Sequence, residues 1–206
     1  MGYDHVLSDD EKRELLRIAR ATLREYLATN RMPPGSPHRE SLIAPGGAFV
    51  SLHRHGDLRG CIGTFADATP LFRTVQEMAV AAACRDPRFD PLGPEDLADI
   101  DIEISVLSSL TPVPDPAEVE VGRHGVHVSR GRSRGVLLPQ VATEHGWDHD
   151  TFLAQTCRKA GLPEDAWRQT DTIVEVFSAQ VFSEKSLTRA AEASLPAADA
   201  QKPHSA

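Results

Sequence analysis

Apolar positions recur at helical spacing in three segments of the chain. The first segment follows Ser8 and Glu11, a pair that fits the capping box of a helix N-terminus. The second starts at a Thr-Pro dipeptide, which is typical of an N-cap and first helical position, and the third ends at a glycine suited to a C-cap. These patterns predict helices over residues 9–29, about 70–84 and about 148–160.

Alternating apolar and polar residues predict strands in other segments. In residues 99–107 the isoleucines face one way, while Asp101 and Glu103 face the other. Residues 47–54 and 58–65 form the two arms of a predicted hairpin around a short turn. Further strands are predicted over residues 118–121, 125–130, 135–141 and 172–184. Because helices and strands mix without regular β-α-β alternation, the pattern favours an α+β fold, with a mainly antiparallel sheet flanked by helices.

The end of the chain has a different composition. Residues 186–206 are rich in Ala, Ser and Pro and carry no periodic pattern, so we expect a disordered tail there. The length of residues 1–185 suits a single domain.

Composition and charge narrow the class of protein. A net charge of −8 argues against a nucleic-acid-binding surface. The chain has neither a long apolar run nor the apolar core of a signal peptide, so we expect a cytoplasmic protein without a membrane partner. Three widely spaced cysteines without a C-x-x-C pair argue against a structural zinc site. No cofactor fingerprint is present, and we expect neither a metal nor a cofactor.

The segment GDLRGCIGTF, residues 56–65, carries the first candidate chemistry. Arg59 lies two residues before Cys61, so in a regular strand the two side chains share a face and the cation favours a thiolate. Gly60 and Gly63 leave room for a ligand or another backbone to approach. The alternative is a buried cysteine that acts as a small apolar side chain.

Hairpin register decides which histidine can reach this cysteine. A loop with an even number of residues places His53 on the face of Leu58, away from Cys61. A loop of odd length or a β-bulge reverses this arrangement. A metal site formed by His53, His55 and Cys61 is a weaker alternative, because no spacing fixes its geometry.

Other charged residues lie in a proline-rich loop and on the long strand. Asp86 and Arg88 form either a functional pair or a local brace of the loop. Glu103 can act as an acid or base if its face of the strand lines a cleft. His124 lies near a predicted hairpin, where exposure to solvent is the default.

The segment LRGCIG, residues 58–63, resembles the signature hexapeptide of the AMMECR domain family. The resemblance continues in order through AAACRDPRFDPL, IDIEISVLSSL and GVLLPQVATEHGWD, and it covers about residues 10–184. It implies a single AMMECR-like domain over residues 1–185, with a larger lobe, a smaller lobe and a cleft between them. Prokaryotic members of this family include AmmeMemoRadiSam system protein A, which implies a Memo-like protein and a radical SAM protein as partners.

The resemblance also implies a set of site residues. The catalytic candidates are Cys61, Glu103 and His124, and the substrate-binding candidates are Arg59, Asp86 and Arg88. One hypothesis is an enzyme-like component of an AmmeMemoRadiSam-type system whose cleft surrounds the cysteine. The other is a non-catalytic adaptor that presents the same surface to a partner protein. The resemblance implies no particular reaction.

Overall fold

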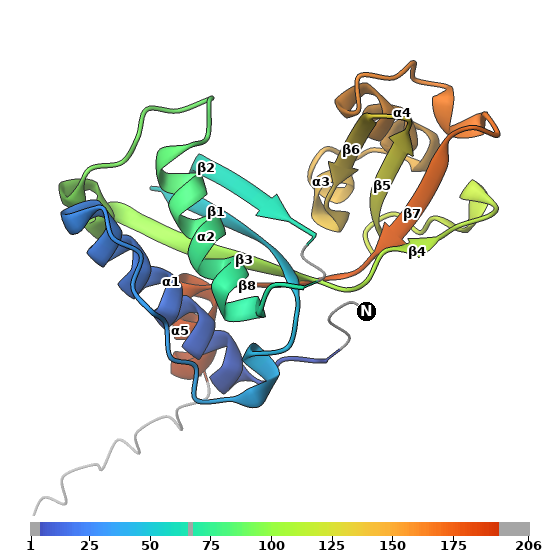
Figure 1. Ribbon diagram of the computed structural model, residues 1–206. Helices are drawn as coiled ribbons and strands as arrows, with labels where there is room; N and C mark the ends of the chain where they lie inside the picture. The colour runs from blue at the N-terminus through green and yellow to red at the C-terminus, as the bar shows by residue number, and fades with distance from the viewer. Residues whose placement is uncertain (1–4, 66–67, 194–206) are drawn as a thin grey trace, which may run out of the picture.

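Two four-stranded antiparallel sheets and their helices make up the computed structural model, which describes residues 5–65 and 68–193 (Figure 1). Sheet 1 has the strand order β2-β1-β3-β8, with β1 Gly47–Arg54, β2 Asp57–Thr64, β3 Ile100–Leu107 and β8 Ala179–Ser183. Sheet 2 has the order β4-β7-β5-β6, with β4 Thr111–Pro112, β5 Gly125–Arg130, β6 Ser133–Leu137 and β7 Ile173–Phe177. The α+β class and the antiparallel pairing predicted from the sequence are confirmed. Within the described residues, no helix combines the length and apolar character needed to cross a membrane.

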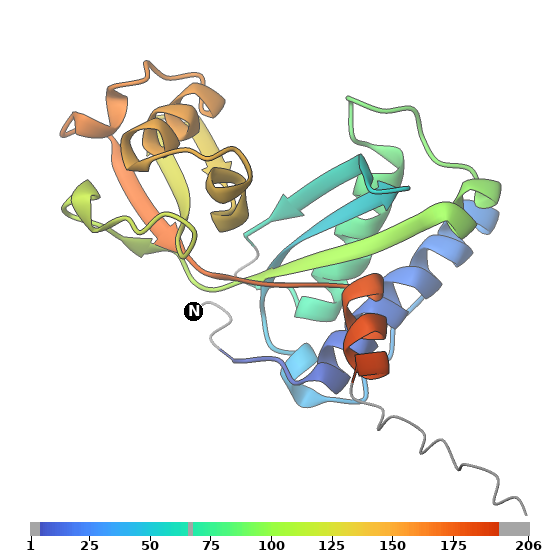
Figure 2. The ribbon, with the colours of Figure 1, turned by 180° about the vertical axis from the view of Figure 1, so that it is seen from behind.

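Sheet 1 buries one face against three helices (Figures 1 and 2). These helices are α1 Asp9–Thr29, α2 Leu71–Cys84 and α5 Glu184–Ala193. The alternate residues of β1 and β3 that fill this core include Ala48, Val50, Leu52, Ile102, Ile104 and Val106. The polar residues between them, such as Ser51 and Glu103, therefore face the other side of the sheet.

Sheet 2 has its own hydrophobic core beneath α3 Pro139–Glu144 and α4 His149–Lys159. Val126, Val128 and Val174 pack there against Phe152 and Cys157. At Gly135 of β6, an added Cβ would lie 2.5 Å from the Thr156 carbonyl oxygen, so the glycine allows α4 to lie directly on the strand.

The strand predicted over residues 172–184 divides at Ser178. β7 belongs to sheet 2 and β8 to sheet 1, and the chain passes between the two sheets at this point (Figure 2). The Ser108 N–H donates to the Ser178 carbonyl at 3.0 Å, and the Ser178 N–H donates to Ser108 Oγ at 2.9 Å. The segment that follows β3 therefore lies beside the segment that precedes β8. The Phe65 ring, which follows β2, meets the Phe177 ring of β7 edge to face at 5.0 Å between centroids.

Two predicted strands differ from the observed elements. Residues 118–121 are not a strand, because Pro116–Glu118 forms a 3₁₀ turn that the Asp115 side chain caps at the Ala117 N–H. The strand predicted over 135–141 ends at Leu137, since Pro139 begins α3.

Part of the segment that was expected to form a disordered tail is helical. Residues 186–193 are helical as part of α5, where Leu187 packs against the core of sheet 1. The Ser186 N–H donates to Ser183 Oγ at 3.1 Å, which satisfies a backbone group at the start of this helix. The remainder of the expected tail, residues 194–206, lies outside the described residues.

The carboxylate of Glu11 in the first turn of α1 should make folding sensitive to acid. Burial opposes its charge, but hydrogen bonds from Ser41 and Ser8 and a contact with His5 lower the pKa of Glu11 from 4.5 to about 2. A depressed folded-state pKa gives stability that is present above pH 4.5 and is lost as the pH falls toward 2. We expect the unfolding free energy of Glu11→Gln, measured with urea, to fall by about 1–3 kcal/mol less than that of wild type over this pH range.

Asp10→Asn is the matched control for this experiment, because the Asp10 side chain is 67% exposed. Its unfolding free energy should follow the wild-type pH dependence. Equal pH slopes for Glu11→Gln and wild type between pH 4.5 and 2 would contradict the assignment to Glu11.

Candidate functional site

A β-bulge in the hairpin of sheet 1 sets the positions of the candidate residues. The loop has two residues, His55 and Gly56, both with positive φ. The register then shifts: His53 pairs with Leu58, but Leu52 pairs with Gly60. Arg59 is the extra residue, and the bulge brings His53 onto the face that carries Cys61. A two-residue loop without a bulge would have placed His53 on the face away from Cys61. The bulge reverses this placement, so the second of the two predicted arrangements is the one observed.

A row of polar side chains crosses three neighbouring strands on the face of sheet 1 away from α1 and α2. Cys61 of β2 pairs with Ser51 of β1, and Ser51 pairs with Glu103 of β3. The Ser51 hydroxyl donates to Cys61 Sγ at 3.3 Å. Ser51 is buried, whereas Cys61 and Glu103 are half-buried. We call Cys61, Ser51 and Glu103 the polar row.

His53 lies next to the polar row. Its Nε2 atom is 4.0 Å from Glu103 Oε1, and it is buried without a hydrogen-bond partner in the described part of the chain. Burial raises the pKa of Glu103; His53 opposes this shift, while Glu144 of α3 and Asp101 add to it. Glu103 therefore holds a proton more readily than an exposed glutamate and can exchange one with a neighbouring group.

Asp86 fixes the backbone of Cys61. This residue is only 4% exposed, and its Oδ2 accepts from the Cys61 N–H at 2.8 Å. Arg88 donates to both carboxylate oxygens, from Nε at 2.9 Å and from Nη2 at 2.6 Å. Hydrogen bonds from Arg88 hold the pKa of Asp86 well below its usual range, against the effect of burial. The pair braces its loop, and the same brace holds the edge strand at the cysteine.

Arg59 and Arg88 lie in different positions relative to the cysteine. The bulge directs Arg59 to the loop, where Nη2 donates to the Asp90 carbonyl at 2.6 Å. Its guanidinium lies 5.6 Å from the Phe89 ring centroid, and that of Arg88 lies 5.3 Å from the same ring. Arg88 also donates to the Cys61 carbonyl at 3.4 Å, and its charge interacts with the cysteine.

His124 is held within its own turn before β5. Its Nδ1 accepts from the Glu120 N–H at 3.1 Å, and its N–H donates to the Glu120 carbonyl at 2.9 Å. Among the described residues, no hydrogen bond joins it to the polar row. The structure thus brings Cys61, Glu103, Asp86 and Arg88 together, whereas the hydrogen bonds of His124 within the described residues join it to Glu120.

Two members of the site were absent from the sequence-based set. Ser51 interrupts the apolar strand GAFVSLHR, and this interruption is the signal that could have identified it. Lys159 of α4 interacts electrostatically with Cys61 and Arg88, although it follows them by many residues. No spacing in the sequence links α4 to the hairpin.

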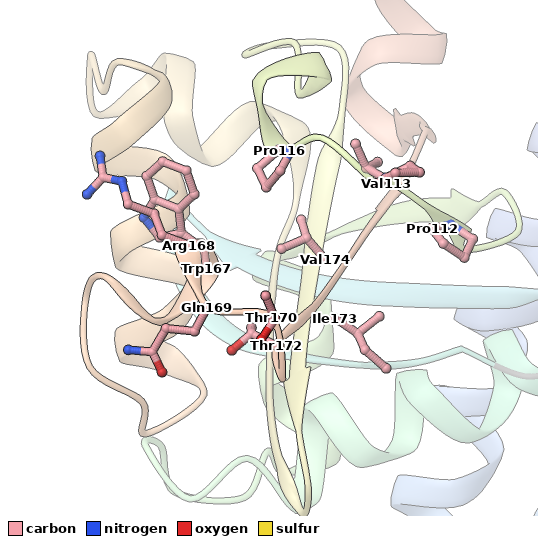
Figure 3. A pocket seen from close by; sticks show the side chains of 11 residues that line it. Pro112, Val113, Pro116, Trp167, Arg168, Gln169, Thr170, Thr172, Ile173 and Val174 are labelled. Carbon is pink, nitrogen blue, oxygen red and sulfur yellow. The ribbon is translucent and has the colours of Figure 1, made fainter.

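A metal centre and a cavity on sheet 2 are the two alternatives to the polar row. No group of three His, Cys, Asp or Glu side chains is placed to hold a metal ion in residues 5–65 and 68–193. A cavity of about 610 Å³ lies on sheet 2, where residues 112–116 face residues 167–174 (Figure 3). None of the six predicted site residues lines this cavity. The cleft expected between two lobes stays a prediction.

Comparison with known proteins relates this arrangement to a family. The model of the AMMECR1 family matches residues 16–182. A protein of Methanothermobacter thermautotrophicus is 47% identical over 191 residues, which cover 86% of this chain and 96% of that protein. A protein of Methanopyrus kandleri is 42% identical and covers 87% of this chain and 91% of its own length. The crystal structure of an uncharacterized protein from Pyrococcus horikoshii has a TM-score of 0.83 at 38% identity, covering 88% of this chain and 95% of that one.

Proposed function

Because the chain belongs to the AMMECR1 family, we propose that it is a cytosolic, enzyme-like component of an AmmeMemoRadiSam-type system. Its reactive centre is the Cys61 thiol, in a cleft between the two sheets. The observation that carries the proposal is the Ser51 hydroxyl, which donates a hydrogen bond to Cys61 Sγ within the polar row. This hydroxyl fixes the position of the sulfur, whose thiolate is the nucleophilic form of cysteine.

Each residue around the thiol has a proposed role. Cys61 is the nucleophile, Ser51 orients its sulfur, and the charge of Arg88 interacts with it. Glu103 moves a proton, with the unpartnered His53 Nε2 close to it. Asp86 positions the Cys61 backbone and the arginine that binds an anionic substrate.

Arg59 and His124 have smaller roles in this proposal than the other predicted residues. Arg59, on the loop with Phe89, is proposed to attract an anionic substrate toward the site. The proposed catalytic role of His124 rests on the family resemblance alone.

The surface formed by Arg59, Phe89 and Arg88 favours a second candidate function, a non-catalytic binding module. Two guanidinium groups lie over one aromatic ring, and arginine and aromatic side chains are the types that dominate binding energy at protein interfaces. The proposed partners are the Memo-like and radical SAM proteins of the same system.

Thiol labelling tests the catalytic proposal. At pH 7 we expect iodoacetamide to label Cys61 in the native protein about tenfold or more faster than Cys84 or Cys157. Burial raises the pKa of both other thiols, and Cys157 is fully buried, so they serve as internal controls. The rates are measured by mass spectrometry of the separate cysteine peptides.

Ser51→Ala should slow the labelling of Cys61 about threefold to tenfold, since it removes one hydrogen bond to the sulfur. Ser105→Ala is the matched control, because Ser105 is a buried serine on the same face of sheet 1. If native Cys61 is labelled no faster than Cys84, the thiol chemistry is excluded and the binding module is the remaining candidate.

A further inference from the structure

Strand β8 forms one outer edge of sheet 1, with β3 on its inner side (Figure 1). The Ser108 N–H donates to the Ser178 carbonyl at 3.0 Å, just before the register of β3 with β8 begins. Because hydrogen-bonded pairs alternate along an antiparallel ladder, the even-numbered residues of β8 also bond to β3 through their backbones. The odd-numbered residues Ala179, Val181 and Ser183 therefore direct their backbone N–H and C=O groups away from β3.

One of these three residues is closed by a side chain. The Ser183 N–H donates to Ser186 Oγ at 2.8 Å, and the Ser186 hydroxyl donates to the Ser183 carbonyl at 2.9 Å. In the described part of the chain, no hydrogen bond reaches the outward backbone groups of Ala179 and Val181. Val181 is also 44% exposed. Two N–H donors and two C=O acceptors are therefore open on this edge.

The N-terminal segment lies near β8, but a side chain holds it. The Leu7 N–H donates to Gln180 Oε1, and Gln180 Nε2 donates to the His5 carbonyl, both at 2.8 Å. Gln180 pairs with Val106, a core residue, so its side chain belongs to the helix-covered face of sheet 1. These contacts leave the outward backbone groups of β8 unused.

The other edges of the two sheets carry features that discourage pairing with a further strand. β2 has the bulge at Arg59, and the Asp86 carboxylate occupies the Cys61 N–H. β4 has only two residues, the second of which is a proline. β6 carries the exposed, charged Arg134. β8, with the sequence Ala-Gln-Val-Phe-Ser, has no charge, no proline and no bulge.

We propose that β8 pairs with β8 of a second copy of this chain, antiparallel about a two-fold axis at Gln180. In this register, Ala179 of each copy lies opposite Val181 of the other, and both pairs are of the hydrogen-bonded type. All the open N–H and C=O groups of Ala179 and Val181 then have partners, and the two copies of sheet 1 become one continuous sheet. An uncharged strand meets no like-charge repulsion from its own copy, which favours a second copy as the occupant of this edge. The inference concerns assembly of the chain and is independent of the proposed function.

Sedimentation equilibrium of the full chain tests the pairing. We expect the wild-type mass to rise from that of one chain toward that of two as the protein concentration increases. Val181→Lys places a charge on the open edge and should raise the dissociation constant about tenfold or more. The variant should still fold, because residue 181 is exposed and does not bond to β3 through its backbone; circular dichroism melting curves check this.

Ile173→Lys is the matched control. Ile173 is a strand residue that is 56% exposed, and it pairs with Ser129 of β5 in sheet 2. The same charge is added far from β8 in the sheet order, so the dissociation constant should stay within about twofold of wild type.

Disulfide formation tests the register. The Cα atoms of a hydrogen-bonded antiparallel pair lie about 5.5 Å apart, a distance that a disulfide can span. The double variant Ala179→Cys/Val181→Cys should therefore form a covalent dimer on mild oxidation, in a yield about threefold or more above that of Val181→Cys alone. Non-reducing gel electrophoresis measures the yield, and the wild type gives the background from the native cysteines.

Each outcome decides the proposal. A mass of one chain at every concentration rejects it and leaves the edge to a strand of a different protein. Equal association of wild type and Val181→Lys shows that the copies meet at another surface. Efficient cross-linking through Val181→Cys alone rejects the register, because Val181 would then lie opposite itself. Weakened association for Val181→Lys but not Ile173→Lys, with a cross-link that needs both cysteines, supports the pairing.

Discussion

Gly60→Ala is expected to lower the free energy of unfolding by about 3 kcal/mol or more. An ideal Cβ at this position would lie 2.2 Å from the Ala82 carbonyl oxygen and 3.0 Å from the carbonyl carbon. Both atoms belong to the backbone of α2, which cannot move aside as a flexible side chain can. The helix must therefore separate from β2 or the strand must bend, and either movement disrupts the core of sheet 1. Urea unfolding followed by circular dichroism measures the loss.

Gly131→Ala provides the matched control. Gly131 has a positive φ of 59°, but an added Cβ meets nothing within 4 Å, so only the backbone conformation opposes the substitution. We expect a loss of about 1 kcal/mol for that variant. If the two variants lose the same stability, close packing of α2 on β2 does not explain the glycine at position 60.

Asp86→Asn should lower the free energy of unfolding by about 2–4 kcal/mol at pH 7. The substitution removes a buried charge that holds the Cys61 N–H and two nitrogens of Arg88, and it places an amide donor among those donors. Because the folded-state pKa of Asp86 is depressed, its contribution is present above its ordinary pKa and declines as the pH falls below it. The difference in unfolding free energy between wild type and Asp86→Asn should therefore be largest near neutral pH and should become smaller in acid.

Asp90→Asn is the control for this experiment. Asp90 is exposed, and it holds Arg59 through its backbone carbonyl, which the substitution retains. Its stability should match wild type within about 0.5 kcal/mol. A similar small effect for Asp86→Asn would show that the carboxylate does not brace the hairpin edge.

Residue alternation predicts the faces of the central strands correctly. Ile102 and Ile104 are fully buried, and Glu103 between them faces the polar row, as the period of two requires. The bulge at Arg59 could not be predicted in the same way, because one extra residue changes the pairing without leaving a distinctive composition. The sequence could state only that such a bulge would bring His53 to the face of Cys61.

Features that depend on contacts between distant parts of the chain were harder to predict from the sequence. Residues 172–184 contain neither glycine nor proline, so no turn residue marks Ser178 as the point where the chain leaves sheet 2 for sheet 1. Lys159 lies on a helix whose periodicity reports its packing on sheet 2 alone. The electrostatic interaction of its charge with Cys61 depends on how the two sheets are placed, which local sequence does not encode.

The crossing of the chain between the sheets has a consequence for folding kinetics. Ser108 and Ser178 are 70 residues apart in sequence, yet they are hydrogen-bonded neighbours where the chain leaves and re-enters sheet 1. A flexible loop of that length would oppose the pairing of β8 with β3 through the entropy of closing it. Sheet 2 is built entirely from the intervening segment, so its folding brings those two serines together and lowers the entropic barrier to adding the last strand of sheet 1.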